Sequence, residues 1–188
     1  MDHVPFSSPP RPVSDAARVP TPALCLRVDL LDAAPPVWRR LRVSARMTLR
    51  RLHGVLCCAL GRTDVESHRF RVGEVVYGHT ADGLPSRDSR WATLGEIVAQ
   101  GIRSFGYELG APGTAVHEVR VEAILEGGAD GDGRVECLAG EGVSPGDAAG
   151  ADGSHDRVAF IVTDVFDGFD VDAVNRALAR LGLPVGRA

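Results

Sequence analysis

Apolar and polar residues alternate along several stretches of the chain, which is the period expected of a β-strand with one buried face. Alternation over residues 23–30 and 37–43 predicts two antiparallel neighbours joined by a proline-containing turn. Residues 158–166 are apolar throughout and fit either a buried strand or a short helix. Further strands are predicted at residues 68–72, 75–77, 105–109 and 119–123, the last two as antiparallel neighbours.

A helical spacing of apolar residues replaces this alternation in three places. Thr48 is a suitable N-cap for a helix over residues 49–60, which we expect to pack on the apolar face of the first two strands. Thr93–Glu96 matches a capping box before a second helix. Asp170 can cap a C-terminal helix that Gly182 ends.

These elements predict a single α+β domain with an antiparallel sheet and two or three helices, one of them C-terminal. With 188 residues, the chain is long enough to bury the core of one domain. We expect residues 1–21, rich in Pro and Ser, to form a disordered tail whose deletion leaves thermal stability nearly unchanged. The domain then covers residues 22–183, with a mobile Gly-, Ala- and Asp-rich loop at 139–157.

Charge is spread unevenly, and every basic residue is Arg. Residues 1–107 hold 15 Arg and 10 Asp plus Glu, a balance of +5, whereas residues 108–188 hold 6 Arg and 15 acids, a balance of −9. Either the two halves fold together and neutralise each other, or the protein carries two surfaces of opposite sign.

Residues 33–63 contain seven arginines and no acidic residue. Arginine beside an aromatic ring suits phosphates and stacked bases, so this run is a candidate surface for a protein partner or for weak, non-specific nucleic-acid binding. The favoured alternative is that its arginines pair with the acidic half while another element covers the tryptophan. The candidate binding residues are Trp38, Arg40, Arg42, Arg50 and Arg51.

His53 and Cys57 are four residues apart and share one face of the predicted helix. Such a pair can ligate a metal or form a Cys–His dyad, but a core histidine beside a buried thiol is the favoured interpretation. His117 and Glu118 would lie on opposite faces of a strand and could not act together. No metal and no cofactor is predicted.

The four cysteines show no paired spacing, which favours a reduced, cytoplasmic protein. No apolar run approaches the ~20 residues that a membrane helix needs, so no membrane partner is expected. Oligomeric state has no signal in the sequence.

Several motifs together resemble the plasmid pRiA4b ORF-3-like family. The resemblance spans roughly residues 22–182, with departures from the family pattern at Arg62, at Glu66, in the block from Tyr107 to His117 and near Ser144. It implies an α+β fold with a β-β-α start, rather like a β-grasp, an origin on plasmids or mobile elements, and no known chemistry. The matching motifs are Pro35-Pro36, Trp38-Arg39-Arg40, Thr48-Leu49, Leu52-His53, Gly61, His68, Phe70, CLAGEG (137–142) and FDVDAVNRAL (169–178).

Two functions follow from these observations. The first is a non-enzymatic binding module of plasmid or mobile-element origin. The second is a hydrolase-like or metal-dependent enzyme using His53, His68 and His117. Three or more polar side chains converging in one pocket would favour the enzyme, whereas a flat Arg-rich face with scattered histidines would favour binding.

We expect the purified protein to contain no stoichiometric zinc, because His53 and Cys57 lack two further ligands at a recognisable spacing. Elemental analysis of protein purified without added metal or chelator tests this. Finding one zinc per chain that is lost in His53→Ala would contradict the expectation.

Overall fold

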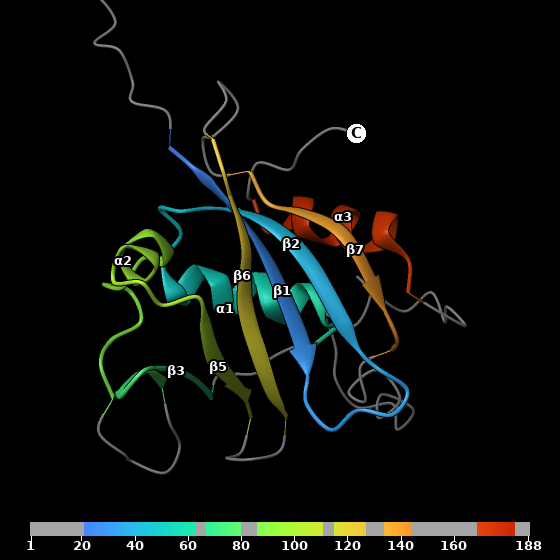
Figure 1. The fold of residues 1–188 in the computed structure, drawn as a ribbon. Helices are drawn as coiled ribbons and strands as arrows, with labels where there is room; N and C mark the ends of the chain where they lie inside the picture. Colours follow the sequence, from blue (N-terminus) through green and yellow to red (C-terminus); the bar gives the residue numbers. More distant parts are fainter. Residues whose placement is uncertain are drawn as a thin grey trace, which may run out of the picture.

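One seven-stranded antiparallel sheet dominates the described part of the chain, and α1 and α3 lie on the same face of it (Figure 1). The computed structural model describes residues 21–62, 67–79, 86–110, 115–126, 134–143 and 169–182. The strands are β1 (Ala23–Leu30), β2 (Trp38–Ser44), β3 (His68–Val72), β4 (Val75–His79), β5 (Ser104–Leu109), β6 (Val116–Leu125) and β7 (Glu136–Glu141). The helices are α1 (Leu49–Ala59), α2 (Leu94–Ala99) and α3 (Val171–Arg180). None of these helices is long and apolar enough to cross a bilayer.

The predicted fold class, a β-grasp-like domain with a β-β-α start, is wrong. The strand order is β4-β3-β5-β6-β1-β2-β7, so the first two strands lie inside one large sheet. β1 pairs antiparallel with β6 as well as with β2, and β7 extends the sheet beyond β2. Alternation identifies a strand but not its neighbours, because the same pattern suits any partner. These long-range pairings therefore could not be read from the pattern.

The local elements lie where the apolar patterns predicted them. β1 and β2 pair antiparallel in a register that sets Leu26 opposite Leu41. The hydroxyl of Thr48 accepts a hydrogen bond from the first turn of α1. β3 and β4 form a tight hairpin, and β5 pairs antiparallel with β6. The Thr93–Glu96 capping box is present at the start of α2, and Asp170 caps α3.

β7 is a strand that alternation did not predict. Its sequence, ECLAGE, contains small residues where a regular strand would carry large apolar ones, and its pairing with β2 makes it a strand. Residues 139–141 belong to this strand. The prediction of a mobile loop at 139–157 is therefore wrong for residues 139–141. The remainder of that loop from residue 144, residues 1–20, and the apolar run 158–166 lie outside the described residues.

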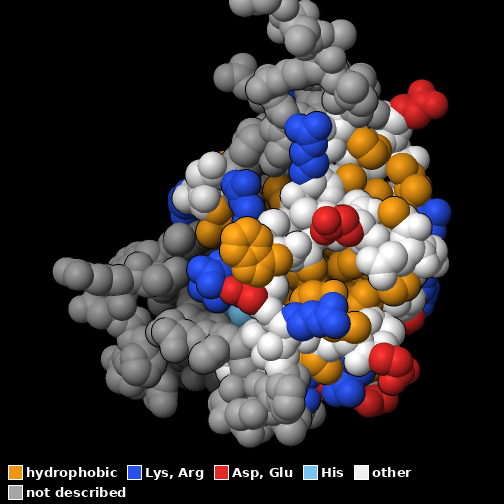
Figure 2. All heavy atoms as spheres, turned by 90° about the vertical axis from the view of Figure 1, so that its left-hand side faces the viewer, with side chains coloured by type: hydrophobic (Ala, Val, Ile, Leu, Met, Phe, Trp, Pro, Cys, Tyr) orange, Lys and Arg blue, Asp and Glu red, His pale blue; other side chains and the backbone are white. Residues whose placement is uncertain are grey.

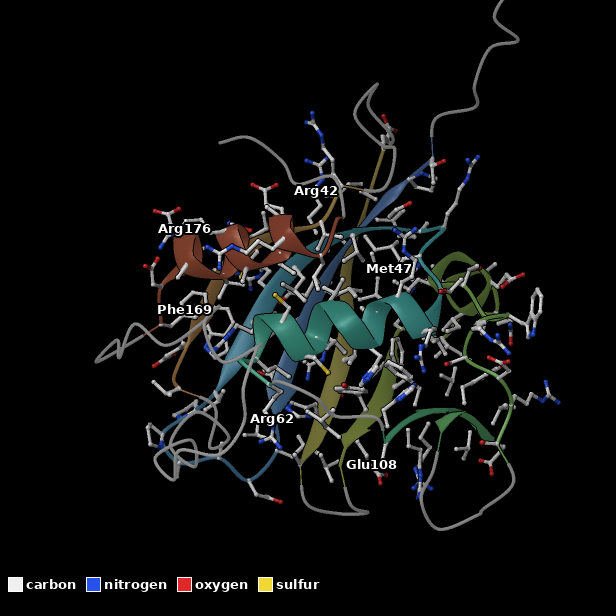
Figure 3. All side chains as sticks on the ribbon, turned by 180° about the vertical axis from the view of Figure 1, so that it is seen from behind. Arg42, Met47, Arg62, Glu108, Phe169 and Arg176 are labelled. Atoms are coloured by element: carbon white, nitrogen blue, oxygen red, sulfur yellow. The ribbon has the colours of Figure 1, made fainter. Side chains whose placement is uncertain are left out.

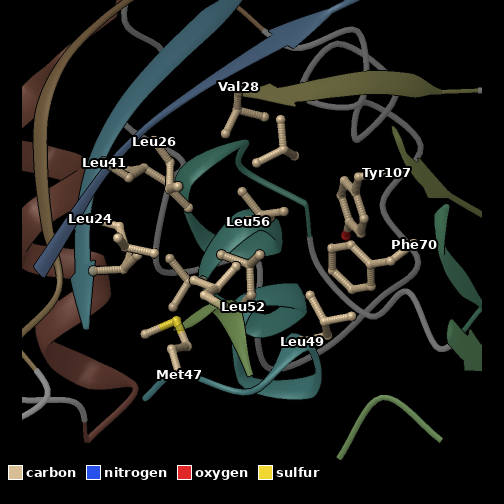
Figure 4. Packing of buried hydrophobic residues seen from close by; sticks show 14 of the residues in the cluster. Leu24, Leu26, Val28, Leu41, Met47, Leu49, Leu52, Leu56, Phe70 and Tyr107 are labelled. Atoms are coloured by element: carbon tan, nitrogen blue, oxygen red, sulfur yellow. The ribbon is translucent and has the colours of Figure 1, made fainter. Parts of the chain in front are cut away.

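The core lies between α1 and the inner face of the sheet (Figure 4). Leu52 and Leu56 of α1 are fully buried, as are Leu26 and Leu41 of the first two strands. The predicted apolar stripe of the helix is thus the side that packs on the sheet.

The C-terminal end of α1 is fastened to the sheet by Arg39, which is only 4% exposed. Its guanidinium donates hydrogen bonds to the carbonyls of Ala59 (2.8 Å), Glu141 (2.8 Å) and Gly142 (3.1 Å). It also lies over the ring of Phe169, 4.4 Å from the centroid. Figure 3 shows Phe169 near this end of α1, ahead of α3. One side chain therefore joins β2, α1, β7 and the residues that lead into α3.

Leu52→Ala and Leu56→Ala should each lower the free energy of unfolding by ~2–5 kcal/mol, because each leaves a cavity in a close-packed core. Urea denaturation followed by circular dichroism measures this. Leu138→Ala on β7, where the side chain is 41% exposed, is the matched control and should change stability by less than ~0.5 kcal/mol. Wild-type-like midpoints for both core variants would contradict the packing of α1.

Candidate functional site

Buried polar side chains gather between α1 and the β3–β5–β6 part of the sheet. His53 comes from α1, His68 from β3, Tyr107 from β5 and His117 from β6, and each is at most 9% exposed. Strand register brings the strand residues together, since Tyr107 lies directly opposite His117 and His68 pairs two positions further along β5. With Cys57 of α1, these four residues form what we term the histidine cluster.

The three histidines that the sequence offered as enzyme candidates do converge. The ring of His53 stacks on that of His68, with centroids 3.8 Å apart and planes 11° from parallel. His53 Nδ1 lies 2.8 Å from the hydroxyl oxygen of Tyr107, and the Tyr107 and His117 rings are tilted with centroids 5.5 Å apart. Sequence analysis did not offer Tyr107 as a site residue, because it identified this residue as part of a strand and of a block that departs from the family pattern.

His53 and Cys57 share one helix face, as their spacing predicted. The Cys57 sulfur lies 3.6 Å from His53 Nδ1 and 3.8 Å from the Tyr107 oxygen. Burial raises the pKa of the Cys57 thiol, and it also raises the pKa of the Tyr107 hydroxyl. A nucleophilic cysteine needs a lowered pKa, so this arrangement opposes a Cys–His dyad.

His117 is buried in the neutral form. Burial lowers its pKa to about 4, and its Nδ1 has no hydrogen-bond partner among the described residues. Glu118 points to the other face of the sheet, where it accepts hydrogen bonds from Ser104 and Arg120, so the predicted separation of the two neighbours is confirmed. Within the described ranges, no three His, Cys, Asp or Glu side chains are placed to hold a metal ion together.

A cavity of about 410 Å³ opens beside the histidine cluster, and we term it the Arg50 pocket. Of the cluster, only His68 lines it. Figure 2 shows a recess on this side of the molecule in which a histidine is visible beside basic and acidic side chains. The lining residues are Arg50, His68, Gly78, Ser86, Asp88, Ser89 and Arg90.

Backbone hydrogen bonds hold the wall of this pocket, residues 86–90, in place. Arg87 pairs with β4 through its amide and its carbonyl, at 2.8 and 3.0 Å. The amide of Arg50, in the first turn of α1, donates to the carbonyl of Ser89 at 3.0 Å. The start of α1, the edge of the sheet and this segment are therefore joined around the pocket.

Two features shape the interior of the pocket. Gly78 has a φ of 134°, and a Cβ there would clash with the carbonyl oxygen of His68, so only glycine lets β4 pass this close to β3. Arg90 donates to both carboxylate oxygens of Asp88, at 2.6 to 3.1 Å. These hydrogen bonds lower the pKa of Asp88, which is therefore ionised at neutral pH. With Arg50, the pocket carries two guanidiniums and one carboxylate.

The structure divides the predicted arginine surface between two sides of the sheet. Trp38, Arg40 and Arg42 lie on the outer face, while Arg50 and Arg51 are exposed on α1, which covers the inner face. Two of these outer residues, Trp38 and Arg40, already form side-chain hydrogen bonds. The Trp38 indole donates to Glu141 at 3.0 Å, and Arg40 donates twice to Glu122 at 2.6 and 3.0 Å.

Stability should fall in acid because of His117. Its pKa is about 4 in the fold against an ordinary value of 6.5 for histidine, so the unfolded chain binds more protons between these values. The stability that depends on a neutral His117 is therefore fully present above pH 6.5 and is lost as the pH falls toward 4. The free energy of unfolding should decrease by about 3 kcal/mol over this range.

Urea melts at steps from pH 7 to 4 test this against His117→Gln, whose free energy of unfolding should depend less steeply on pH. The ring titration, followed by NMR in the wild-type protein, measures the pKa directly. Equal slopes for the two proteins, with a ring pKa near 6.5, would contradict the burial of a neutral His117.

Comparison with known proteins gives a family and a fold. No curated protein matches this chain. A crystal structure of a protein of unknown function from Methanosarcina mazei Go1 matches with a TM-score of 0.57 and 23% identity, covering 64% of this chain and 70% of that one. This likeness concerns the fold alone. The family described as "Plasmid pRiA4b ORF-3-like protein" matches residues 22–171, and the chain therefore belongs to the plasmid pRiA4b ORF-3-like family.

Proposed function

We propose that this protein is a non-enzymatic binding module that holds an anionic group of a small ligand in the Arg50 pocket. The observation that carries the proposal is the lining of one concave site by Arg50, Arg90 and Ser89; the hydroxyl of Ser86, also in the lining, already donates to the Gly78 carbonyl at 3.0 Å. Guanidiniums and hydroxyls are the donors that bind phosphate and carboxylate groups. A cavity of about 410 Å³ also falls in the size range of small-ligand sites.

The chemistry of the histidine cluster supports binding over catalysis. A general acid or base needs a pKa near the working pH and access to the substrate. His117 has a pKa of about 4, and the pKa values of Cys57 and Tyr107 are raised, so these groups stay uncharged at neutral pH. His53 stacks on His68 and contacts Tyr107, which makes the cluster a packed polar core beneath the pocket.

An enzyme remains the second candidate, and one observation favours it. His53, His68 and His117 converge as the enzyme hypothesis required, and His68 reaches the pocket wall. In this reading His68 would exchange a proton with the ligand while His53 and Tyr107 position its ring. Release of orthophosphate from pyrophosphate that disappears in His68→Gln would support the enzyme and contradict the non-enzymatic proposal.

The outer face is the less favourable place for a partner. Arg40 is held by Glu122 and Trp38 by Glu141, so a protein docking there would have to compete with existing contacts. Nucleic acid is expected to bind weakly at most, because the arginines are split between two faces and the charge density on each is low. Arg42 lies on the outer face and Arg51 on the inner face. Replacing each by Gln compares how much the two faces contribute to nucleic-acid binding.

Titration with inorganic pyrophosphate by calorimetry tests the proposal. Arg50→Gln should weaken binding about tenfold or more, because a hydrogen bond to a charged group contributes ~1.5–3 kcal/mol. Affinity should also fall as salt is raised.

Arg51→Gln is the matched control, since it removes the same charge from the next residue of α1, outside the pocket lining. Binding should then stay close to wild type. Equal losses in both variants would show a general charge effect, and no detectable binding by the wild-type protein at low salt would refute the proposal.

A further inference from the structure

Trp91 is a large hydrophobic side chain that the core does not use. It is 79% exposed, and it directly follows Arg90, which lines the Arg50 pocket. Figure 2 shows a large hydrophobic side chain standing at the surface beside basic and acidic side chains, next to the recess. An exposed indole beside a polar pocket offers a flat surface on which an aromatic ring can stack.

The turn that carries Trp91 is anchored at several points. Its own amide donates to the carbonyl of Asp88 at 3.3 Å, and the amide of Arg90 donates to the Asp88 carboxylate at 2.9 Å. Just beyond it, the amide of Leu49 donates to the carbonyl of Ala92 at 2.9 Å.

The turn is therefore bonded to the first residues of α1, which also carry Arg50. The chain holds the indole and the guanidinium in one local framework, and such preorganisation lowers the entropy lost on binding.

We infer that the Arg50 pocket takes a nucleoside phosphate, an inference that rests on the function proposed above. The phosphate would lie at Arg50 with the hydroxyl of Ser89, and the base would stack on Trp91. The ionised carboxylate of Asp88, already oriented by Arg90, would accept hydrogen bonds from sugar hydroxyls. A bare phosphate gives Asp88 and Trp91 nothing to bind, whereas a nucleotide uses both.

The pocket favours a free nucleotide over a nucleic-acid strand. A strand places further phosphates near the site, where Asp88 repels them and where Arg50 and Arg90 are the cations of the lining. A cavity of about 410 Å³ suits one nucleotide-sized ligand.

The experiment compares ADP, inorganic pyrophosphate and adenosine by calorimetry with the full-length protein. We expect ADP to bind at least tenfold more tightly than pyrophosphate, because stacking a base on an aromatic side chain gives a gain of that order. In Trp38→Phe, which leaves Trp91 as the single tryptophan, ADP should quench the tryptophan fluorescence while pyrophosphate should not.

Substitutions separate the two parts of the ligand. Trp91→Ala should weaken ADP binding about tenfold or more and leave pyrophosphate binding within twofold. Arg50→Gln should weaken both, and Arg51→Gln should weaken neither. Trp91 is mostly exposed, so a thermal melt of Trp91→Ala should match the wild type and confirm that folding is intact.

The outcomes distinguish the nucleotide inference from the anion-binding proposal on which it rests. If pyrophosphate does not bind, the anion pocket itself is refuted and the inference falls with it. If pyrophosphate binds but ADP binds no more tightly, and Trp91→Ala does not change the affinity for ADP, only the nucleotide assignment is overturned. Tighter binding of a twelve-residue oligothymidylate than of ADP would also overturn it, in favour of a single-stranded nucleic acid.

Discussion

The arrangement of this domain depends on the contacts that the guanidinium of Arg39 makes. This guanidinium brings three distant motifs together, because Arg39 lies in β2, its acceptors are Glu141 at the end of β7 and the following Gly142, and Phe169 leads into α3. Gly140 is part of the same junction, since a Cβ there would press on both the Phe169 ring and the Arg39 side chain. Arg39 also donates to a carbonyl in the last turn of α1, where the helix dipole favours a positive charge.

This junction fixes one end of α1, and hydrogen bonds around its first turn fix the other. Thr48 caps the helix, and the amide of Arg50 is bonded to Ser89. Held at both ends, α1 places His53 against the sheet and Arg50 at the pocket. The buried cluster and the surface pocket are thus two outcomes of the same helix position, and His68 is the residue they share.

The contrast between cluster and pocket shapes the proposed function. Burial keeps Cys57, Tyr107 and His117 of the cluster neutral at neutral pH, which suits a packed polar core more than a reaction site. The pocket instead presents its charges to solvent, where a ligand can meet them. The arginines that looked like one surface serve different purposes: Arg39 is structural, Arg40 forms an ion pair across strands, and Arg50 lines the pocket.

Apolar periodicity and capping residues by themselves determined the strands β1 to β6, the helices and the helix ends, because both signals act between residues close in the chain. The family was also evident from motifs such as Trp38-Arg39-Arg40. Tertiary structure alone decided the strand order, the pairing of β7, the meeting of three histidines with Tyr107, and the partner of each arginine. The physical reason is that a periodic pattern reports which face of an element is buried, whereas the identity of the neighbour depends on packing over the whole sheet.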